Sequence, residues 1–365
     1  MTVLSDGKQK AALRRKLLNW YGKHARVLPW RANRDAYRIW LSEVMLQQTT
    51  VAMATPYFER FVAEFPTVHD LAVADEQRIL RMWEGLGYYR RARGLHAAAK
   101  QVVAEHGGIF PRDVASLMRL PGVGRYTAGA VASFAYDTPA PIVEVNTLRV
   151  ITRLMAFEGD PASTSGQRHI WQTAEELVPR KGAGRFNYAL MELGAVVCKP
   201  AAPRCGACPV TAHCAAFQQG LQNELPRLAA KAKPTAVREA AVVVRRNGHV
   251  LLRQRPKGER WENMWDFPRF VLTSEGPLFV RDELIAKTRE QTGVTIEPGA
   301  VLKTIKHGVT RFRITLDCYA ARPNGGRVRS TAAKPVRWTP LADLSHLPLS
   351  VSARKIAGLI TTRLT

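Results

Sequence analysis

Two glutamates, Glu43 and Glu144, are the candidate acid–base residues of this sequence. Glu43 lies inside the apolar segment Trp40–Leu46. On a helix it would be buried, and the desolvation would raise its pKa, which suits a general acid at neutral pH. Burying a carboxylate without a use is costly, so a functional role is favoured for Glu43. Glu144 precedes a predicted helix, where the dipole favours an ionised carboxylate; the alternative is a simple N-terminal helix charge.

A second candidate site is a cluster of thiols. Disulfides are not expected in a chain without an export signal, whereas four closely spaced thiolates bind a soft metal. Zinc and a [4Fe–4S] cluster are both compatible with the spacing, although a zinc site more often shows two C-x2-C pairs and here there is one. Cys318 stands apart on a predicted strand and is expected to be a small buried hydrophobe. The clustered thiols have the spacing C-x6-C-x2-C-x5-C and are Cys198, Cys205, Cys208 and Cys214.

The segment LPGVG at residues 120–124 precedes a helix predicted to begin near Tyr126. Glycines at a helix start expose backbone N–H groups, so Gly122, Val123 and Gly124 form a candidate phosphate site. An ordinary connection between two helices also uses glycine, and both interpretations stay open for the segment alone.

The elements that must position these residues are predicted from hydrophobic periodicity. Residues 8–225 are typical of an almost entirely helical domain. Helices are predicted over residues 9–21, 37–49, 51–64, 75–84, 89–106, 114–118, 126–135, 146–156, 167–177 and 185–197.

The pattern changes after a basic, proline-bounded segment at residues 224–234. Beyond it, Asn247-Gly248 separates two short strands and predicts a hairpin. Further on, a helix is predicted over residues 278–292 and a strand over 311–319, which makes this part α+β. We therefore predict one domain at 1–225, a linker at 226–236 and a second domain at 237–365.

Composition narrows the class of protein. Hydrophobic residues make up 46% of the 365 residues, which excludes a disordered or collagen-like chain and allows two buried cores. No apolar stretch reaches the ~18 residues of a membrane-spanning helix. The polar residues 1–10 do not resemble a secretory signal, so a cytoplasmic protein is expected.

The net charge of +24 favours a polyanionic partner, with nucleic acid ahead of a membrane surface. Residues 1–220 carry 28 Lys and Arg against 18 Asp and Glu, and residues 221–365 carry 26 against 12. The shorter C-terminal part is thus the more basic, and both parts are candidates to lie against phosphate.

Together, LPGVG, the downstream carboxylate and the cysteine spacing resemble the helix–hairpin–helix base-excision glycosylases with an iron–sulfur cluster. The segments LPWR at 28–31, SEVMLQQT at 42–49 and GLGYY at 85–89 narrow the resemblance to adenine DNA glycosylases of the MutY type. The resemblance covers residues 10–360. It implies an all-α glycosylase domain with a [4Fe–4S] loop at 198–214, followed by an α+β Nudix-like lesion-recognition domain.

The same resemblance implies a reaction, the removal of adenine mispaired with 8-oxoguanine from duplex DNA by a nucleoid-associated monomer. The base must be flipped out, and the bond breaks with one protonated and one ionised carboxyl. Glu43 matches the general acid that protonates adenine at N7, Glu144 the carboxylate that stabilises or captures the sugar cation, and Asn146 its supporting amide. Tyr126 stands where bifunctional relatives carry a lysine nucleophile, so no Schiff base can form there and a monofunctional enzyme is expected.

Further roles are implied for residues around the base. Gln48 and Tyr88 match residues that wedge into the duplex. Core packing is the alternative for Trp30 and Tyr88. The residues that match the adenine pocket are Arg26, Leu28, Trp30, Arg31, Leu46, Thr49 and, at a position where relatives differ, Tyr188.

The chain departs from the family pattern at its proposed site. Glu144 replaces the expected Asp and Val145 the usual Gly, which lengthens the carboxylate arm by about one methylene where geometry is needed to within ~0.5 Å. Tyr188 replaces a Glu or Gln that bonds adenine in relatives. Thr310 and Arg311 stand where a Ser-His pair is expected to contact 8-oxoguanine, and Arg311 is a permanent donor toward a lesion or a phosphate.

The Nudix-like part keeps only Glu290 of the carboxylates that bind Mg²⁺ in pyrophosphohydrolases, so binding without hydrolysis is expected. Two alternatives to the leading function remain. One is a glycosylase with altered mispair specificity, because of Tyr188 and Arg311. The other is a lesion-binding homologue with impaired catalysis, because of Glu144.

Overall fold

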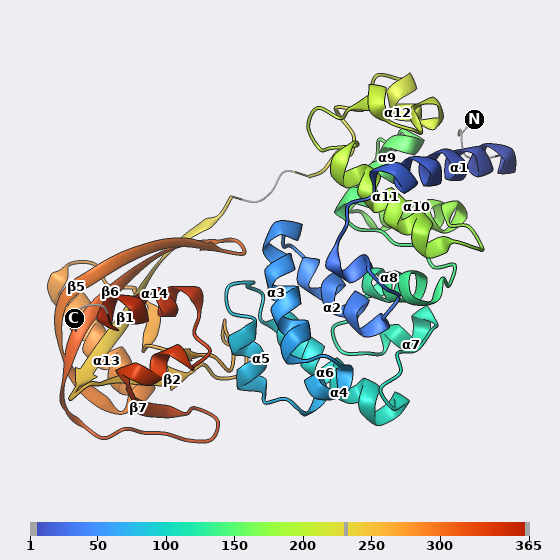
Figure 1. Ribbon diagram of the computed structural model, residues 1–365. Coiled ribbons are helices and arrows are strands. Elements are labelled where there is room, and N and C mark those ends of the chain that lie inside the picture. Colours follow the sequence, from blue (N-terminus) through green and yellow to red (C-terminus); the bar gives the residue numbers. More distant parts are fainter. Residues whose placement is uncertain (1–5, 230–232, 362–365) are drawn as a thin grey trace. The chain divides into compact units, whose positions relative to one another are not determined.

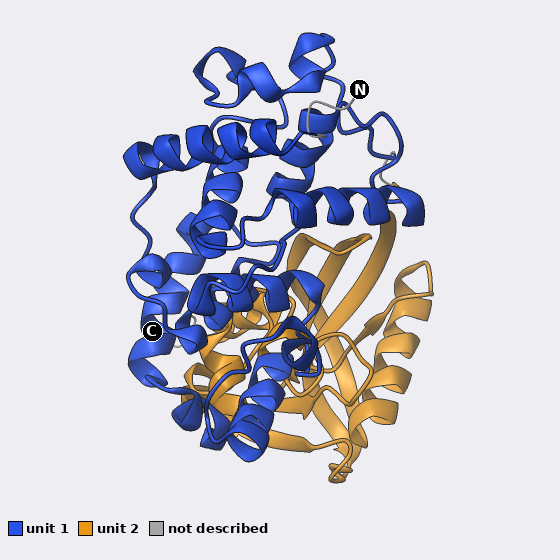
Figure 2. Cartoon of the chain, turned by 90° about the vertical axis from the view of Figure 1, so that its right-hand side faces the viewer, with its two compact units in different colours: residues 1–74, 93–230 blue, residues 75–92, 231–365 orange. Residues whose placement is uncertain are grey.

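The computed structural model describes residues 6–229 and 233–361. It divides the chain into two compact units (Figures 1 and 2). Unit 1 comprises residues 1–74 and 93–230, and unit 2 comprises residues 75–92 and 231–365. The predicted domains were continuous in sequence, whereas here a segment from the middle of the helical part groups with the second unit. The predicted linker at 226–236 falls partly outside the described residues, and a strand begins at Thr235.

Unit 1 is helical, as its periodicity predicts. Leu13 and Leu17 of the first helix pack with Ile151, Phe186 and Leu193 in a buried core. The helices are α1 (Gly7–His24), α2 (Ala36–Leu46), α3 (Val51–Glu64), α4 (Val68–Val73), α6 (Arg90–His106), α7 (Val114–Met118), α8 (Arg125–Tyr136), α9 (Val145–Met155), α10 (Thr164–Leu177), α11 (Ala183–Val196) and α12 (Ala215–Gln218), with 3₁₀ turns η1 (Pro29–Arg31), η2 (Cys205–Ala207) and η3 (Thr211–His213).

The helix that carries Glu43 ends earlier than predicted. Asp35 caps the N-terminus of α2, accepting hydrogen bonds from the backbone of Tyr37 and Arg38. The sequence predicts this helix to Thr49, but α2 ends at Leu46 because Gln48 adopts a left-handed backbone with φ of 56°. Thr50 then caps α3. Gln48 therefore lies on a sharp turn between two helices.

Unit 2 is a mixed sheet with a helix against each face. Its strands follow the order β3-β2-β1-β6-β5, with β4 paired to β1 and β7 to β2, and only β1 and β6 run parallel. The strands are β1 (Thr235–Arg246), β2 (His249–Gln254), β3 (Trp265–Asp266), β4 (Arg269–Val271), β5 (Val294–Val309), β6 (Phe312–Gly326) and β7 (Val336–Pro340); the helices are α5 (Glu76–Met82), α13 (Pro277–Thr292) and α14 (Val351–Thr361), with η4 at Leu341–Ser345.

Alternation along β1 explains this layering. Val242 packs with Val280 and Leu284 of α13, whereas Val243 packs on the other face with Ile356 of α14. The hairpin predicted at Asn247-Gly248 is confirmed, since both residues have positive φ and Arg246 pairs with His249. Cys318 is fully buried in the α14-facing core, as predicted. Among the described helices, none combines the length and apolarity needed to cross a membrane.

Candidate active site

A cavity of about 840 Å³ in unit 1 gathers most of the predicted site residues. Glu43 comes from α2, Tyr126 from the start of α8 and Glu144 from the start of α9, so side chains far apart in sequence share one space. The predicted residues that line it are Arg26, Leu28, Trp30, Arg31, Glu43, Leu46, Gln48, Thr49, Gly124, Tyr126, Glu144, Asn146 and Tyr188.

Glu43 is the buried acid of this cavity. It is 2% exposed, and its carboxylate accepts a short hydrogen bond from the Tyr126 hydroxyl. Burial raises the pKa of Glu43 to about 7, and the nearby Glu144 acts in the same direction, while the bond from Tyr126 and the charge of Arg31 oppose the rise. Burial also raises the pKa of Tyr126 well above its usual value, so this hydroxyl stays a donor.

Glu144 caps the N-terminus of its own helix. Its two carboxylate oxygens accept hydrogen bonds from the backbone N–H of Thr147 at 2.9 Å and of Asn146 at 2.8 Å. The Thr147 hydroxyl accepts the Glu144 N–H in return, which completes a capping box. Burial raises the pKa of Glu144, and the N–H donors of α9 act against that rise. The Glu144 carboxylate is therefore folded back onto the start of α9.

Asn146 connects Glu144 to the cysteine loop. Its Nδ2 donates to a Glu144 oxygen at 3.2 Å, and its Oδ1 accepts from the buried Arg149 at 2.9 Å. The same guanidinium donates to the backbone carbonyls of Cys198 at 2.7 Å and Gly194 at 2.8 Å. A continuous chain of hydrogen bonds thus links the first clustered cysteine to the carboxylate, and Arg149 is a residue that the sequence reasoning missed.

The opposite wall of the cavity is aromatic and cationic. Tyr188 stacks on Phe134 with ring centroids 3.7 Å apart, and Arg31 lies over the Tyr188 ring at 4.8 Å. Arg31 donates to Glu192 at 2.9 Å, and Arg26 forms a second ion pair with the same carboxylate. The predicted arginines are therefore oriented by a buried acid.

Glu192 was not predicted, although it has a detectable sequence signal: a lone carboxylate in an apolar helix, one turn after Tyr188. Its side chain is fully buried. Burial alone would raise the pKa of Glu192, but Arg26 and Arg31 outweigh it and hold the pKa below its usual value. A buried carboxylate with two cations is expected to stay ionised.

Two predicted pocket residues also belong to the core. Trp30 is 2% exposed and packs edge-on against Phe58, with ring centroids 5.4 Å apart. Leu28 is 9% exposed. Both residues also line the cavity. Trp30 therefore packs in the core on one side and borders the cavity on the other.

The LPGVG hairpin forms at the start of α8. Gly122 has a φ of 74° and Gly124 caps α8 with extended backbone. Gly122 and Gly124 are exposed, whereas Val123 is buried and anchors the turn. A Cβ on Gly94 of α6 would lie 3.6 Å from the Gly122 Cα, so small residues allow close approach there. The exposed backbone is consistent with a phosphate site, which stays a prediction.

The four clustered cysteines lie in one loop after α11. Arg153 donates to the Cys198 sulfur at 3.2 Å, and the Cys214 thiol donates to the Arg153 carbonyl at 3.4 Å. Burial raises the pKa of Cys214 to about 11, and the other three thiols contribute to that rise. Among the described residues, no three His, Cys, Asp or Glu side chains are grouped closely enough to form a metal site. The fit to a metal rests on four thiol donors that share one environment.

The remaining predicted residues lie in unit 2. Tyr88 is 46% exposed with a φ of 47°, on a loop before α6. Thr310 and Arg311 form the exposed turn between β5 and β6, where Thr310 has a φ of 50° and Arg311 lies over the Phe312 ring at 5.2 Å. These positions are accessible, and their roles stay predictions.

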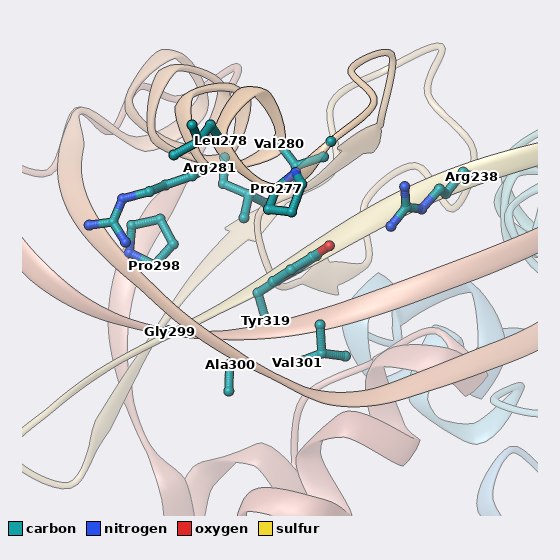
Figure 3. A pocket seen from close by; sticks show the side chains of 12 residues that line it. Arg238, Pro277, Leu278, Val280, Arg281, Pro298, Gly299, Ala300, Val301 and Tyr319 are labelled. Carbon is teal, nitrogen blue, oxygen red and sulfur yellow. The ribbon is translucent and has the colours of Figure 1, made fainter.

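Glu290, the retained Nudix carboxylate, is exposed and pairs with Lys287 at 3.2 Å. Beside it, the Gln291 side chain accepts a hydrogen bond from the Arg269 N–H at 3.2 Å and donates one to the Arg269 carbonyl at 3.1 Å. A separate cavity of about 560 Å³ lies between the start of α13 and the bulge of β5 at residues 298–301 (Figure 3). Arg238 and Tyr319 line it, and Arg238 is already paired with Asp317 at 3.0 Å.

Comparison with known proteins identifies the family. Residues 41–178 match the HhH-GPD superfamily of base excision DNA repair proteins, and residues 239–358 match the NUDIX domain. The chain is 34% identical to an adenine DNA glycosylase of Rattus norvegicus, over 97% of this chain and 79% of the relative. The chain belongs to the adenine DNA glycosylase family.

Other relatives of this adenine DNA glycosylase family member agree with the assignment. An adenine DNA glycosylase of Mycolicibacterium smegmatis is 45% identical over 54% of this chain and 67% of the relative. Among solved structures, a thermostable thymine-DNA glycosylase matches with a TM-score of 0.53 and 28% identity, over 58% of this chain and 98% of that one. The predicted fold class, a helix–hairpin–helix glycosylase domain followed by a Nudix-like α+β domain, is confirmed.

Proposed function

We propose that this family member excises adenine mispaired with 8-oxoguanine from duplex DNA, as a monofunctional monomer in the bacterial nucleoid. The observation that carries the proposal is Glu43, a buried carboxyl with a pKa of about 7 that shares one cavity with Glu144. Such a pair can divide the roles of acid and charge stabiliser between two environments. A base within the duplex cannot reach a cavity of this kind, so the adenine must be flipped out.

Glu43 is the proton donor in this mechanism. At neutral pH a large fraction of its carboxyl groups carries the proton, and Tyr126 holds the carboxyl in place. The proton moves to N7 of the flipped adenine. The C1′–N9 bond then breaks, its electron pair leaves with the base, and the sugar becomes oxocarbenium-like.

Glu144 acts on the sugar side. Its carboxylate is bonded to the first N–H groups of α9, which stabilise its negative charge, and to the Asn146 amide. An ionised Glu144 stabilises or captures the sugar cation until water adds at C1′ and loses a proton. Since burial raises the pKa of this carboxyl, its N–H donors are needed to keep it ionised near neutral pH.

The base is held by the aromatic and cationic wall. Tyr188 lines the cavity with its ring held between Phe134 and Arg31, and Arg31 and Arg26 are oriented by Glu192. Leu28, Trp30, Leu46 and Thr49 complete the pocket. Arginine donors address the acceptor nitrogens of adenine, while the stacked ring replaces the contact that a Glu or Gln would make.

Monofunctional chemistry follows from the nucleophiles at hand. Among the described residues that line the cavity, none is a lysine, and Tyr126 is bonded to Glu43 with a pKa raised by burial. Water is then the acceptor of the sugar, and the DNA strand is left intact at an abasic site.

The four cysteines would hold a [4Fe–4S] cluster, which would tie the loop at residues 198–214 together. The assignment is supported by the contacts of Arg153 with the Cys198 and Cys214 sulfurs and by the electrostatic interaction of Cys214 with the other three thiols of the loop. Through Arg149, the loop would also help to position Asn146 and Glu144. Around the lesion pair, Gln48 and Tyr88 would wedge into the duplex and Thr310 and Arg311 would contact 8-oxoguanine. The turn at residues 122–124 would hold a backbone phosphate.

Single-turnover release of adenine tests the function. Duplexes carrying A opposite 8-oxoguanine, G, C or T are compared at one defined salt concentration. We expect the fastest release opposite 8-oxoguanine. Glu43→Gln should lower that rate by about 10²–10⁴-fold, as for loss of a general acid. The exposed Glu59 supplies the control, since Glu59→Gln removes a carboxylate outside the cavity. Preserved release in Glu43→Gln, or none with the parent chain, contradicts the proposal.

A second candidate function follows from Glu144. Because both its oxygens are engaged by its own helix, the chain is a candidate for a lesion-binding protein with impaired catalysis. The leading function predicts that Glu144→Gln abolishes release and that Glu144→Asp leaves it equal or lower. The second candidate predicts tight, salt-sensitive binding without release, and a sharp gain of rate in Glu144→Asp. Binding and release on the same duplex separate the two.

A further inference from the structure

Residues 75–92 occupy an unexpected place in the fold. They lie inside the stretch that matches the HhH-GPD family, yet they form a compact unit with residues 231–365 (Figure 2). The segment contains α5 and the loop that carries Tyr88. Contacts within unit 2 explain why it belongs there.

Arg354 of α14 binds the end of this segment. Its Nε donates to one oxygen of Glu84 at 2.7 Å and a terminal nitrogen donates to the other at 2.9 Å. Such a two-point pair fixes the angle between the groups as well as their distance. The Glu84 side chain is only 9% exposed and that of Arg354 28%. Arg354 also donates to the carbonyls of Leu344 and Leu347, so its guanidinium is anchored without Glu84.

Further hydrogen bonds hold α5 along its length. At its start, the Asn263 amide donates to Glu76 at 2.7 Å, and Gln77 donates to the Asn263 carbonyl at 3.0 Å. Near its end, Arg81 donates to the Ser345 carbonyl at 2.9 Å. The helix is therefore fastened at both ends, and Glu84 is the last fastening before the loop.

The loop after Glu84 has a backbone that needs external support. Gly85 and Gly87 have φ of 101° and 72°, and Tyr88 has a φ of 47°, a region that a residue with a side chain rarely adopts. Trp83 donates to the Gly87 carbonyl at 3.1 Å, and Arg91 donates to the same carbonyl at 3.2 Å. Trp83 and Arg91 therefore hold the peptide group that precedes Tyr88.

We infer that Arg354 is a positioning residue for Tyr88, through Glu84. The Nudix-like unit thereby holds the exposed aromatic ring in the left-handed conformation in which it meets DNA. The same unit carries the turn at 310–311, so the ring and the lesion-facing turn engage the duplex as one body. The inference rests on the proposed function for its catalytic consequence, but the clamp itself is a property of the free protein.

The first experiment measures amide hydrogen exchange in the free, full-length protein. Arg354→Gln and Glu84→Gln should each raise exchange across residues 84–92 by about tenfold and leave exchange in unit 1 unchanged, because local opening replaces a fixed loop. Glu290→Gln is the matched control, since it breaks an ion pair of unit 2 far along the chain from this segment. Unchanged exchange at 84–92 in both variants overturns the clamp.

The second experiment measures release of adenine opposite 8-oxoguanine under single-turnover conditions. Arg354→Gln should slow release about tenfold, since only a fraction of molecules holds Tyr88 in place. In a Tyr88→Ala background the same substitution should cost nothing further, a coupling that a merely structural role would not produce. Additive losses, or an unchanged rate in Arg354→Gln, overturn the positioning role. A parent chain that releases no adenine defeats the proposed function and the catalytic role of Arg354 together, and leaves the exchange result to decide the clamp.

Discussion

At the residue scale, the site depends on opposing demands made on two carboxyl groups. Glu43 has one hydroxyl partner in an apolar setting, so its burial is barely compensated and the proton is retained near neutral pH. Glu144 is nearly as enclosed but faces the N–H groups of a helix start. One is suited to give a proton and the other to bear a charge. The type and number of hydrogen-bond donors, more than burial itself, separate the two roles.

The pH dependence of base release follows from these pKa values. Glu43 must be protonated, so the rate should fall as pH rises through about 7, and Glu144 must be ionised, so it should also fall as pH drops through the raised pKa of that group. Tyr126→Phe removes the bond that lowers the pKa of Glu43 and should move the alkaline limb upward, on the order of one pH unit.

The control for that prediction is Tyr57→Phe, which removes the hydroxyl of a half-buried tyrosine outside the cavity lining. A pH–rate profile of the single-turnover rate gives both limbs. An alkaline limb that stays in place, or that moves downward in Tyr126→Phe, would mean that Tyr126 does not set the protonation of Glu43.

At the element scale, the elements that the sequence predicted correctly are those fixed by local residue patterns, such as hydrophobic periodicity and turn residues. Helical periodicity located α3 and α7 to the residue, and Asn247-Gly248 located the first hairpin. The predicted helix ran to Thr49, beyond the true end of α2, because no residue near Gln48 signals its left-handed backbone. The sequence pattern left β5 unpredicted, since register shifts near residues 298–301 break the alternation that identifies a strand.

What the sequence could not predict depends on contacts across long separations. The two carboxylates and Tyr126 were named from motif positions, but the partnership of Glu192 with Arg26 and Arg31 requires the packed unit. Likewise, Glu84 and Arg354 are separated by 270 residues, and neither stands out in its own segment. The helix α5, which its own sequence pattern predicts, is thus joined to unit 2 by a few partly buried or exposed polar contacts.

At the scale of the whole molecule, charge is the property that both units contribute to binding. Unit 2 carries 29 Lys and Arg against 14 Asp and Glu, and unit 1 carries 25 against 16. Binding to duplex DNA releases counterions, with a slope of log K against log salt of about −0.9 for each phosphate neutralised. Arg311 lies in the exposed turn between β5 and β6 that is proposed to contact the lesion, and the exposed Arg313 follows it on β6.

Neutralising this turn should separate phosphate binding from lesion contact. Arg311→Gln with Arg313→Gln is expected to reduce the slope by about 1.8 if both meet phosphate, and to weaken binding to A·G and A·8-oxoguanine duplexes alike. Arg281→Gln, an exposed arginine on α13, is the control. Fluorescence anisotropy across a salt series measures the slope. An unchanged slope with a selective loss for 8-oxoguanine would assign Arg311 to the lesion instead, because a base contact changes discrimination between duplexes without changing the number of counterions released.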